Sequence, residues 1–458
     1  MQYGPYAVDY ENRPYNPERM RNERIARAQA SLKKHGLGAM MVFDYDYQRY
    51  LGYYSSHQYN RRRLGHFALL IEGAGFPYTP KDYFGGTWDQ SRMPWFNDKM
   101  ILETSKTFAI QQALPEHPDY VPKQMDKMVA EVKALLVKHG KADMPIGIDI
   151  SNYDLIRAFD RAGLKICDGL LTMTDAMQIK TQDEIYCLRM AGVFAESAHW
   201  EVCKALRPGM TELQIAGIAA NACFKLGAEE LEGPSFVVCS GERSGHVVPN
   251  MPTDRIVRPG DFVVIDINGV SFQGYRTCFY RTYLVGDQPT QFQKDVYKVA
   301  RDGLYAMTSL VKPGITTADI SREWQKLGDF PGGWGRTAKW PEPGRRFAGS
   351  VMHSIGLRSG DGGPTVAGFT ANTGYMMPPV TIEENMCFAV EVGCFTWLGD
   401  KWAKDGVKIE HCGVVTKDGF DVFYRAPKHD LIVCGLPGTY FSVDDAGTNV
   451  NAATAGHD

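Results

Sequence analysis

The sequence predicts a two-domain α/β protein of the α+β kind, and three observations support this class. The chain has 458 residues, which is enough for two domains with well-filled cores. Short apolar runs alternate with segments of helical spacing along most of its length. Two Pro-Gly-x-Thr helix starts, at Pro208 and Pro313, indicate an internal duplication in the second half.

The first half of the chain predicts an N-terminal arm followed by an α/β domain. Residues 1–20 are polar and rich in Tyr, Asn and Pro, so we expect an extended arm. Helical spacing from Pro17 ends at Gly36, and a second amphipathic helix is expected near 122–139. Strands are predicted in GLGAMMVFDY, HFALLIEG and MPIGIDIS. We therefore place the first domain at 21–175.

The second half predicts a further domain at 176–430. Thr181 and Glu184 have the spacing of a capping box, which predicts a helix start there, and Thr211 and Gln214 repeat it. Strands are predicted in FVVCSG, FVVIDIN, CFYRTYLVG, CFAVEVG and VKIEHCGVV. Residues 431–458 form a tail that is either an extended arm on a neighbour or loosely ordered.

Composition excludes several classes of protein. The net charge is −3 without a long run of Lys or Arg, which argues against nucleic acid or an anionic membrane as partner. The N-terminus resembles neither a signal nor a transit peptide, and no apolar stretch approaches the length of a membrane span. The 10 cysteines are scattered without CxxC pairs. They read as reduced thiols, which predicts a cytoplasmic protein.

Four polar side chains lie in or beside the predicted strands of the second domain. Asp266 lies in FVVIDING, His353 in MHSIGL, Glu391 in CFAVEVG and Glu410 in VKIEHCGVV. A carboxylate in an apolar strand is costly to bury unpaired, which indicates a functional role for both glutamates. Hard divalent cations prefer carboxylate oxygens with an occasional imidazole. The pattern therefore predicts either a metal site or a pair of catalytic carboxylates.

Several motifs, in order over about 180–425, resemble the pita-bread family of creatinases and metallopeptidases. They are IKTQDEIYCLRMA, PNMPTDRIVRPGDFVVID, GYRTCFYRTYLVG, HSIGL, AVEVG and VKIEHCGVVTKDG. The resemblance implies a creatinase-like N-terminal domain and a C-terminal pita-bread domain with internal pseudo-twofold duplication. It also implies a homodimer in which the N-terminal domain of one subunit reaches the partner's site.

Three positions depart from the peptidases of that family. The second metal aspartate falls on Cys278, which follows Asp266 by 12 residues in place of the usual 11. Asn250 and Gly360 stand where those peptidases carry histidines that hold the substrate carbonyl and move protons. The departures favour the non-peptidase branch, which includes creatinase, ectoine hydrolase and a dimethylsulfoniopropionate lyase.

The same departures bear on the metal. Loss of a bridging carboxylate disfavours two metal ions, so one expectation is that His353, Glu391 and Glu410 hold a single divalent ion, zinc, iron or manganese, with Asp266 nearby. Alternatively Cys278 replaces the bridge as a thiolate, which favours zinc or iron. A third interpretation is a metal-free site, as the resemblance to creatinase implies, in which the two glutamates act as base and electrostatic stabiliser.

Further candidates lie in loops. Arg61 and Arg63, in the run Arg61–Arg63, are candidates to bind a substrate carboxylate in a fork. His246 and Asn250 are candidates to bind substrate, and Asp361 is a candidate acid or base in a Gly-rich loop.

These observations predict an enzyme that hydrolyses a C–N bond in a small, carboxylate-bearing zwitterion. One alternative is a metal-dependent lyase in which Asp361 removes a proton. A second is an Xaa-Pro-type metallopeptidase. A third is a catalytically dead module that binds peptide or protein. The retention of four of the five ligand positions argues against this third alternative.

Overall fold

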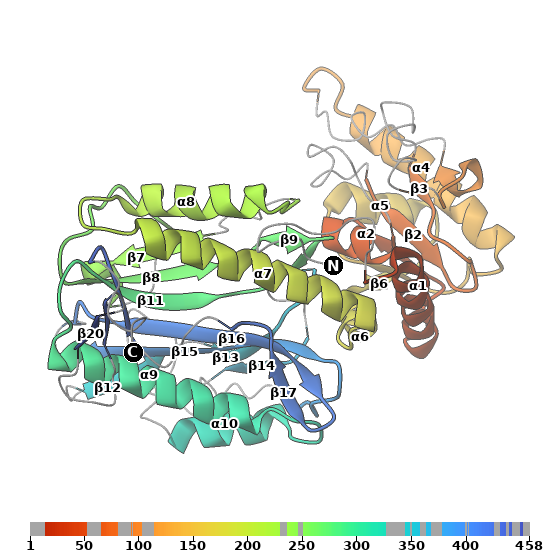
Figure 1. The fold of residues 1–458 in the computed structure, drawn as a ribbon. Helices are drawn as coiled ribbons and strands as arrows, with labels where there is room; N and C mark the ends of the chain where they lie inside the picture. The colour runs from red at the N-terminus through yellow and green to blue at the C-terminus, as the bar shows by residue number, and fades with distance from the viewer. Residues whose placement is uncertain are drawn as a thin grey trace. The chain divides into compact units, whose positions relative to one another are not determined.

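The computed structural model describes residues 14–52, 66–80, 93, 95–102, 114–229, 236–245, 251–326, 344–348, 350–357, 363–367, 378–398, 401, 403–425, 431–436, 439–441 and 449–451. These residues form two compact units (Figure 1). One unit comprises Asn16–Met177, and the other comprises the described residues from Gln178 onward together with Pro14 and Tyr15.

The N-terminal unit is built on a four-stranded sheet in the order β2-β1-β5-β6. Strand β1 (Ala39–Val42) runs antiparallel to β2 (Ala68–Ile71) and parallel to β5 (Ile146–Ile148), which is parallel to β6 (Ile166–Asp168). The helices are α1 (Pro17–Lys34), α2 (Tyr45–Tyr50), α4 (Tyr120–Lys138), α5 (Tyr153–Arg161) and α6 (Leu170–Met177). Strands β3 (Thr79–Pro80) and β4 (Ile101–Leu102) form a short parallel pair, and the 3-10 turn η2 (Asp98–Met100) comes directly before β4.

Local sequence explains the helices of this unit. Asn16 accepts hydrogen bonds from the backbone N–H groups of Glu18 and Arg19, and Pro17 occupies the first helical position of α1. Helix α4 buries side chains at intervals of three and four residues against the sheet, which are Met125, Met128, Val129, Val132 and Leu136.

The larger unit contains two six-stranded sheets. The first has the order β20-β19-β18-β11-β8-β7. Its strands are β7 (Phe236–Ser240), β8 (Asp261–Ile267), β11 (Tyr280–Val285), β18 (Leu431–Cys434), β19 (Thr439–Phe441) and β20 (Asn449–Asn451). The second sheet has the order β14-β13-β15-β16-β17, with β12 also paired to β15. Its strands are β12 (Gly344–Ala348), β13 (Ser350–Ser354), β14 (Thr365–Ala367), β15 (Cys387–Trp397), β16 (Val407–Thr416) and β17 (Gly419–Val422). The remaining short elements are η3 (Gly241–Arg243), β9 (Ser271–Phe272) and β10 (Tyr275–Arg276).

The predicted duplication is present in this unit. Helices α7 (Gln182–Ala205) and α8 (Glu212–Lys225) flank one Pro-Gly turn, and α9 (Gln291–Leu310) and α10 (Thr317–Lys326) flank the other. Both turn glycines have positive φ, 91° at Gly209 and 87° at Gly314, which a residue with a Cβ rarely adopts. Each second helix follows a threonine whose hydroxyl caps it, Thr211 and Thr316.

The two halves stack in layers (Figure 1). Helices α7 and α8 lie against the first sheet, and α9 and α10 lie against the second. Helix α9 buries Val296, Ala300 and Leu304 against β15 and β16, where Val390 and Ile409 face it. Because side chains alternate along a strand, the residues between these valines and isoleucines face the opposite side, toward the first sheet.

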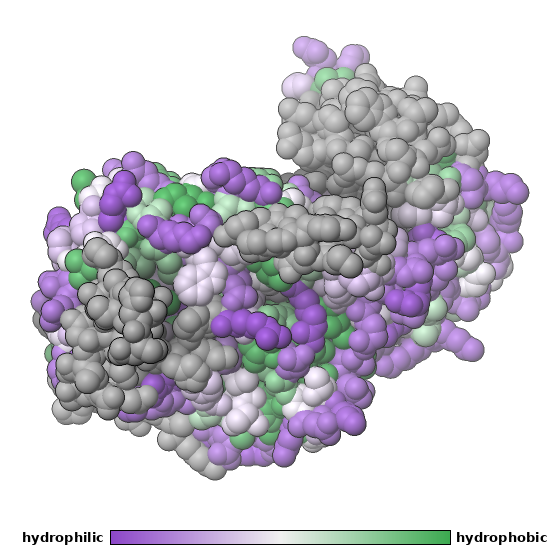
Figure 2. All heavy atoms as spheres, viewed as in Figure 1, coloured by the Kyte–Doolittle hydropathy of each residue, from purple (hydrophilic) through white to green (hydrophobic). Residues whose placement is uncertain are grey.

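Residues that we assigned to a C-terminal tail take part in the first sheet. Strand β18 pairs in parallel with β11, and β19 and β20 extend the sheet from it. Among the described residues, no helix combines the length and apolarity needed to cross a membrane. On the face drawn in Figure 2, hydrophobic and hydrophilic residues are interspersed over the described surface.

Candidate active site

Strand pairing brings the predicted site residues together from both sheets of the larger unit. On the first sheet, Asp266 of β8 lies opposite Tyr280 of β11. On the second, Glu391 of β15 lies opposite Glu410 of β16, and His353 of β13 pairs with the residue two before Glu391. On the second sheet, Glu391, Glu410 and His353 occupy the strand faces that point away from α9, because the alternate residues pack in the core cluster with that helix.

Three of them form a cluster of possible metal ligands. Among the described residues, the ligand atoms of Cys278, His353 and Glu410 lie within 4.8 Å of one another. The Nδ1 of His353 lies 3.0 Å from the carbonyl oxygen of Ser354 and therefore donates to it. That bond fixes the tautomer and leaves the lone pair on Nε2, which lies 3.9 Å from Oε1 of Glu410.

Glu410 is the most enclosed member of the cluster, with 0% exposure. Its Oε2 accepts a hydrogen bond of 3.1 Å from the backbone N–H of Tyr280. Its Oε1 has no hydrogen-bond partner within the described part of the chain. Burial, and then the charges of Asp266 and Glu391, raise the pKa of Glu410 well above its usual range. A cation at Oε1 would satisfy this oxygen and stabilise its charge, so the residues fit a metal ion.

The donor set favours particular metals. A thiolate sulfur, an imidazole nitrogen and a carboxylate oxygen suit zinc or iron(II) better than magnesium or calcium. Burial, followed by the negative charges of Glu410 and Asp266, raises the pKa of Cys278 well above its usual value. The group is therefore a neutral thiol on its own, and a bound cation is what would make it a thiolate. The carbonyl oxygen of Cys278 accepts hydrogen bonds from Cys412 Sγ, at 2.9 Å, and from the hydroxyl of Tyr424.

Asp266 lies beside the cluster with 1% exposure. Its carboxylate accepts hydrogen bonds from the backbone N–H of Phe279, at 3.1 Å, and from Nδ2 of Asn268, at 2.5 Å. Burial raises the pKa of Asp266 to about 6, against the opposing positive charge of Lys408. A carboxyl group with this pKa exchanges a proton near neutral pH, as an acid or base in catalysis must.

Lys408 is a site residue that the sequence analysis did not identify. Its Nζ lies 2.7 Å from Oε2 of Glu391 and 3.8 Å from the ring centroid of Tyr280, and the residue is 4% exposed. Burial lowers the pKa of Lys408, but the charges of Glu391, Glu410 and Asp266 outweigh burial and raise it. The lysine is therefore charged. The sequence does contain a signal for this role: Lys408 lies two residues before Glu410 on one strand, so both side chains face the same side of the sheet.

Arg281 ties the two sheets together behind the site. Its Nη1 donates to the carbonyl oxygens of Tyr280, at 2.8 Å, and of Glu410, at 2.7 Å. Thr282 makes two hydrogen bonds with the backbone of Lys408, donating from Oγ1 to its carbonyl oxygen and accepting from its N–H. These bonds hold β11 and β16 in fixed register, so the site strands are pre-positioned.

The structure thus assembles Asp266, Cys278, His353, Glu391 and Glu410 in one region, but it divides their contacts. Cys278, His353 and Glu410 converge on one point, whereas Glu391 pairs with Lys408. The remaining candidates lie outside the described residues and stay predictions; they are Arg61, Arg63, His246, Asn250 and Asp361.

Comparison with known proteins places this site in a family context. The model of metallopeptidase family M24 matches residues 186–417. The chain is 31% identical over 256 residues to an Xaa-Pro dipeptidase of Lactobacillus helveticus, covering 56% of this chain and 62% of that protein. It is 28% identical over 255 residues to a probable dipeptidase PepE of Mycobacterium tuberculosis, covering 56% of this chain and 60% of that one. The matches thus span about 60% of these relatives' length.

Solved structures share the fold over nearly the whole chain. An Xaa-Pro dipeptidase from Bacillus anthracis superposes with a TM-score of 0.67 at 20% identity, covering 91% of this chain and all of that one. An X-Pro aminopeptidase from Thermotoga maritima has a TM-score of 0.65 at 19% identity, covering 89% of this chain and 99% of that one. At these identities the likeness establishes the α/β and pita-bread architecture that the sequence predicts.

Proposed function

Because the chain belongs to metallopeptidase family M24, we propose that it hydrolyses a C–N bond with one divalent metal ion held by Cys278, His353 and Glu410. The observation that carries this proposal is the convergence of three ligand atoms within 4.8 Å. One of the three residues is Glu410, whose buried Oε1 has no hydrogen-bond partner among the described residues. In such sites three protein ligands leave an open position for water or substrate.

A metal ion at this position would supply a water of lowered pKa and would polarise the carbonyl group of the substrate. The protein's own residues then supply proton transfer and orientation. Asp266, with its pKa raised to about 6 by burial, can accept a proton and return it to the leaving nitrogen. Lys408 and Glu391 form a buried ion pair beside it, which orders this wall of the site.

We propose short peptides as the first substrate class, Xaa-Pro dipeptides among them. The names of the relatives support this choice, since two of them are an Xaa-Pro dipeptidase and a probable dipeptidase. Hydrolysis of a peptide bond breaks a C–N bond next to a carbonyl group, which the arrangement of ligands and Asp266 suits.

A second candidate is a small, carboxylate-bearing compound that is not a peptide. Three sequence positions favour it, because Cys278 replaces a carboxylate and Asn250 and Gly360 replace histidines expected in the peptidases. Arg61 and Arg63 remain candidates to bind the substrate carboxylate, in a homodimer where the N-terminal domain of one subunit reaches the partner's site. A cytoplasmic location also remains a prediction.

One experiment tests the proposal and separates the substrate classes. The protein is purified without added metal, its metal content is measured, and zinc-, iron(II)- and manganese-loaded samples are assayed for amine release. One panel contains Xaa-Pro and other dipeptides, and the other contains betaines, guanidino acids and N-acyl amino acids. Glu410→Gln is the test variant, and Glu383→Gln, at an exposed position, is the matched control.

We expect amine release by a metal-loaded protein and its loss in Glu410→Gln with the metal. Turnover by metal-free protein would favour the creatinase-like mechanism instead. An unsaturated product without added water would indicate a lyase. Absence of turnover on both panels by a metal-loaded protein would count against the proposed hydrolase.

A further inference from the structure

Three carboxylates and one ammonium group meet between the two sheets of the larger unit. Asp266, Glu391 and Glu410 are all less than 10% exposed, and Lys408 is 4% exposed. The ammonium makes its close contact with Glu391, at 2.7 Å, and its charge also acts on Asp266 and Glu410. The ligand cluster comprises Cys278, His353 and Glu410 and does not include Glu391.

We propose that Lys408 takes the place of a second cation at this site, so that the protein binds one metal ion per chain and Glu391 is a counter-ion to the lysine. The inference rests on the metal site of the proposed function and goes beyond it by naming what excludes a second ion, which is the ammonium group of Lys408 with Glu391 as its counter-ion.

The short distance between Lys408 and Glu391 means that a metal ion bound to Glu391 would be repelled by the lysine. A metal ion on Oε2 of Glu391 at the usual ~2.1 Å would lie less than about 5 Å from the ammonium nitrogen. At that separation a dication and an ammonium repel strongly, because few water molecules or salt ions screen buried charges. The side chains of Lys408 and Glu391 are 5% and 8% exposed, so solvent gives little relief.

The lysine cannot easily move aside for an ion. Thr282 bonds both backbone groups of Lys408, at 2.9 and 3.0 Å, which fixes where the side chain begins. The ring of Tyr280 lies 3.8 Å from the ammonium and attracts it. Moving the charge away would also leave Glu391 buried without its partner, which costs far more than breaking an exposed ion pair.

Two-metal hydrolase sites commonly hold their ions about 3.5–4 Å apart, with carboxylates shared between them. Here the position expected to supply a bridging aspartate is Cys278, and the carboxylate of Glu391 is neutralised by Lys408. The positive charge of the lysine therefore offsets part of the carboxylate charge that a second ion would otherwise balance.

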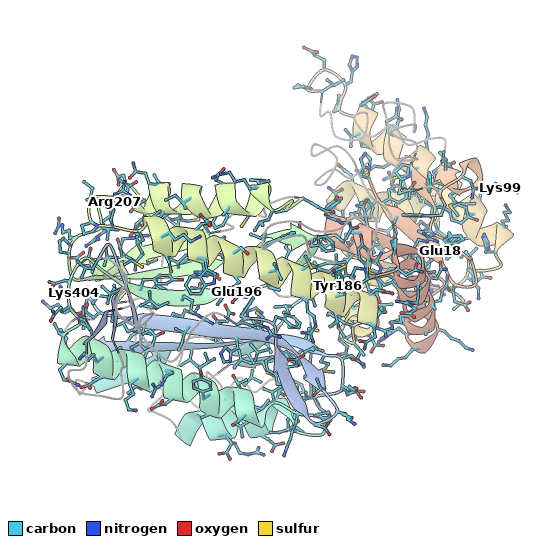
Figure 3. The ribbon with its side chains drawn as sticks, in the orientation of Figure 1. Glu18, Lys99, Tyr186, Glu196, Arg207 and Lys404 are labelled. Carbon is cyan, nitrogen blue, oxygen red and sulfur yellow. The ribbon has the colours of Figure 1, made fainter. Side chains whose placement is uncertain are left out.

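The test measures metal stoichiometry, which does not depend on activity. Full-length wild type, Lys408→Met, Glu391→Gln and Glu410→Gln are dialysed against excess Zn²⁺ or Mn²⁺ and then freed of loose ions by gel filtration. Metal per chain is measured by mass spectrometry, and folding is checked by circular dichroism. Lys404→Met is the matched control, because Lys404 is exposed in the loop before β16 (Figure 3).

We expect one ion per chain in wild type, Lys404→Met and Glu391→Gln, none in Glu410→Gln, and two in Lys408→Met. Two ions in wild type, loss of the ion in Glu391→Gln, or one ion in a folded Lys408→Met would each overturn the inference while leaving a metal-dependent hydrolase possible. No ion in wild type would overturn the metal site of the proposed function itself. If Lys408→Met does not fold, the Glu391→Gln result still decides whether Glu391 is a ligand.

Discussion

His199 should make the stability of this protein depend on pH, in a way that one substitution removes. The residue lies on α7 and is 2% exposed. Its Nε2 lies 2.7 Å from the carbonyl oxygen of Phe279, and its Nδ1 lies 2.8 Å from the hydroxyl of Tyr283. The neutral ring therefore donates from Nε2 and accepts at Nδ1, which uses both nitrogens without a charge.

Burial dominates the titration of this ring and lowers its pKa to about 3, although the bond to Phe279 acts in the opposite direction. In the unfolded chain the pKa returns to about 6.5. Below pH 6.5 the unfolded state therefore binds a proton that the folded state does not, and stability falls as the pH falls. The stability is fully present above about pH 6.5, and the loss is complete near pH 3.

The magnitude follows from the unfolded pKa. At pH 5 the solution is about 1.5 pH units below that value, and each unit corresponds to about 1.36 kcal/mol. Since the folded pKa of about 3 lies well below pH 5, the expected loss is about 2 kcal/mol relative to pH 7.5. Other groups also titrate over this range, so the comparison must be with a variant that differs in this ring alone.

His199→Gln is that variant. A glutamine amide can donate to the carbonyl oxygen of Phe279 and accept from the hydroxyl of Tyr283, but it does not ionise. Unfolding by urea at pH 7.5 and pH 5, followed by far-UV circular dichroism, gives the free energy of unfolding of both proteins. Wild type should lose about 2 kcal/mol more than the variant between the two pH values. Equal losses would refute the argument that a buried neutral imidazole couples folding to pH.

Other predictions follow from single side chains. Cys278→Ser should lower metal content as Glu410→Gln does, and retention of a full complement of zinc would remove the thiol from the ligand set. Glu212→Ala should cost about 3–5 kcal/mol in chemical denaturation, because this carboxylate, at 0% exposure, accepts hydrogen bonds from Ser240 and Thr253 and pairs with Arg243; a loss under 1 kcal/mol would contradict this. Gly245→Ala should cost about 3 kcal/mol, because an added Cβ would lie 1.8 Å from the carbonyl oxygen of Ala403. Gly217→Ala, with no described atom within 4 Å of its added Cβ, should gain about 0.5–1 kcal/mol in the free energy of unfolding. A higher melting temperature for Gly245→Ala than for Gly217→Ala would contradict the packing described around these two glycines.

The fold was predictable where local chemistry decides it. The capping boxes at Thr181 and Thr211 start α7 and α8, because each threonine and its partner satisfy backbone groups without help from the rest of the chain. The apolar runs of β8, β15 and β16 are long enough to be identified as strands. Strands β18, β19 and β20 were not predicted, because they have four, three and three residues, and β18 joins the sheet by pairing with β11 across a long stretch of sequence.

The site was predictable in its residues more than in its contacts. Asp266, Glu391 and Glu410 stand out as carboxylates in apolar strands, a signal that is visible without a structure. Which carboxylate faces a cation and which faces a lysine depends on cross-strand register and on the loops. A one-residue change in the pairing of β15 with β16 would move one of these glutamates to the other face of the sheet.

The observed register explains how the carboxylates divide their partners. Glu391 lies opposite Glu410, and Lys408 lies opposite Gly393. Since Gly393 has no side chain, the lysine can lean across the strand to its diagonal neighbour Glu391, within the reach of a long side chain. Glu410 instead directs Oε2 to the backbone N–H of Tyr280, which leaves Oε1 facing His353. The pairing of β15 with β16 therefore places Glu391 beside Lys408 and leaves Glu410 available for a metal ion. A larger side chain at Gly393 should displace the lysine and disturb that division.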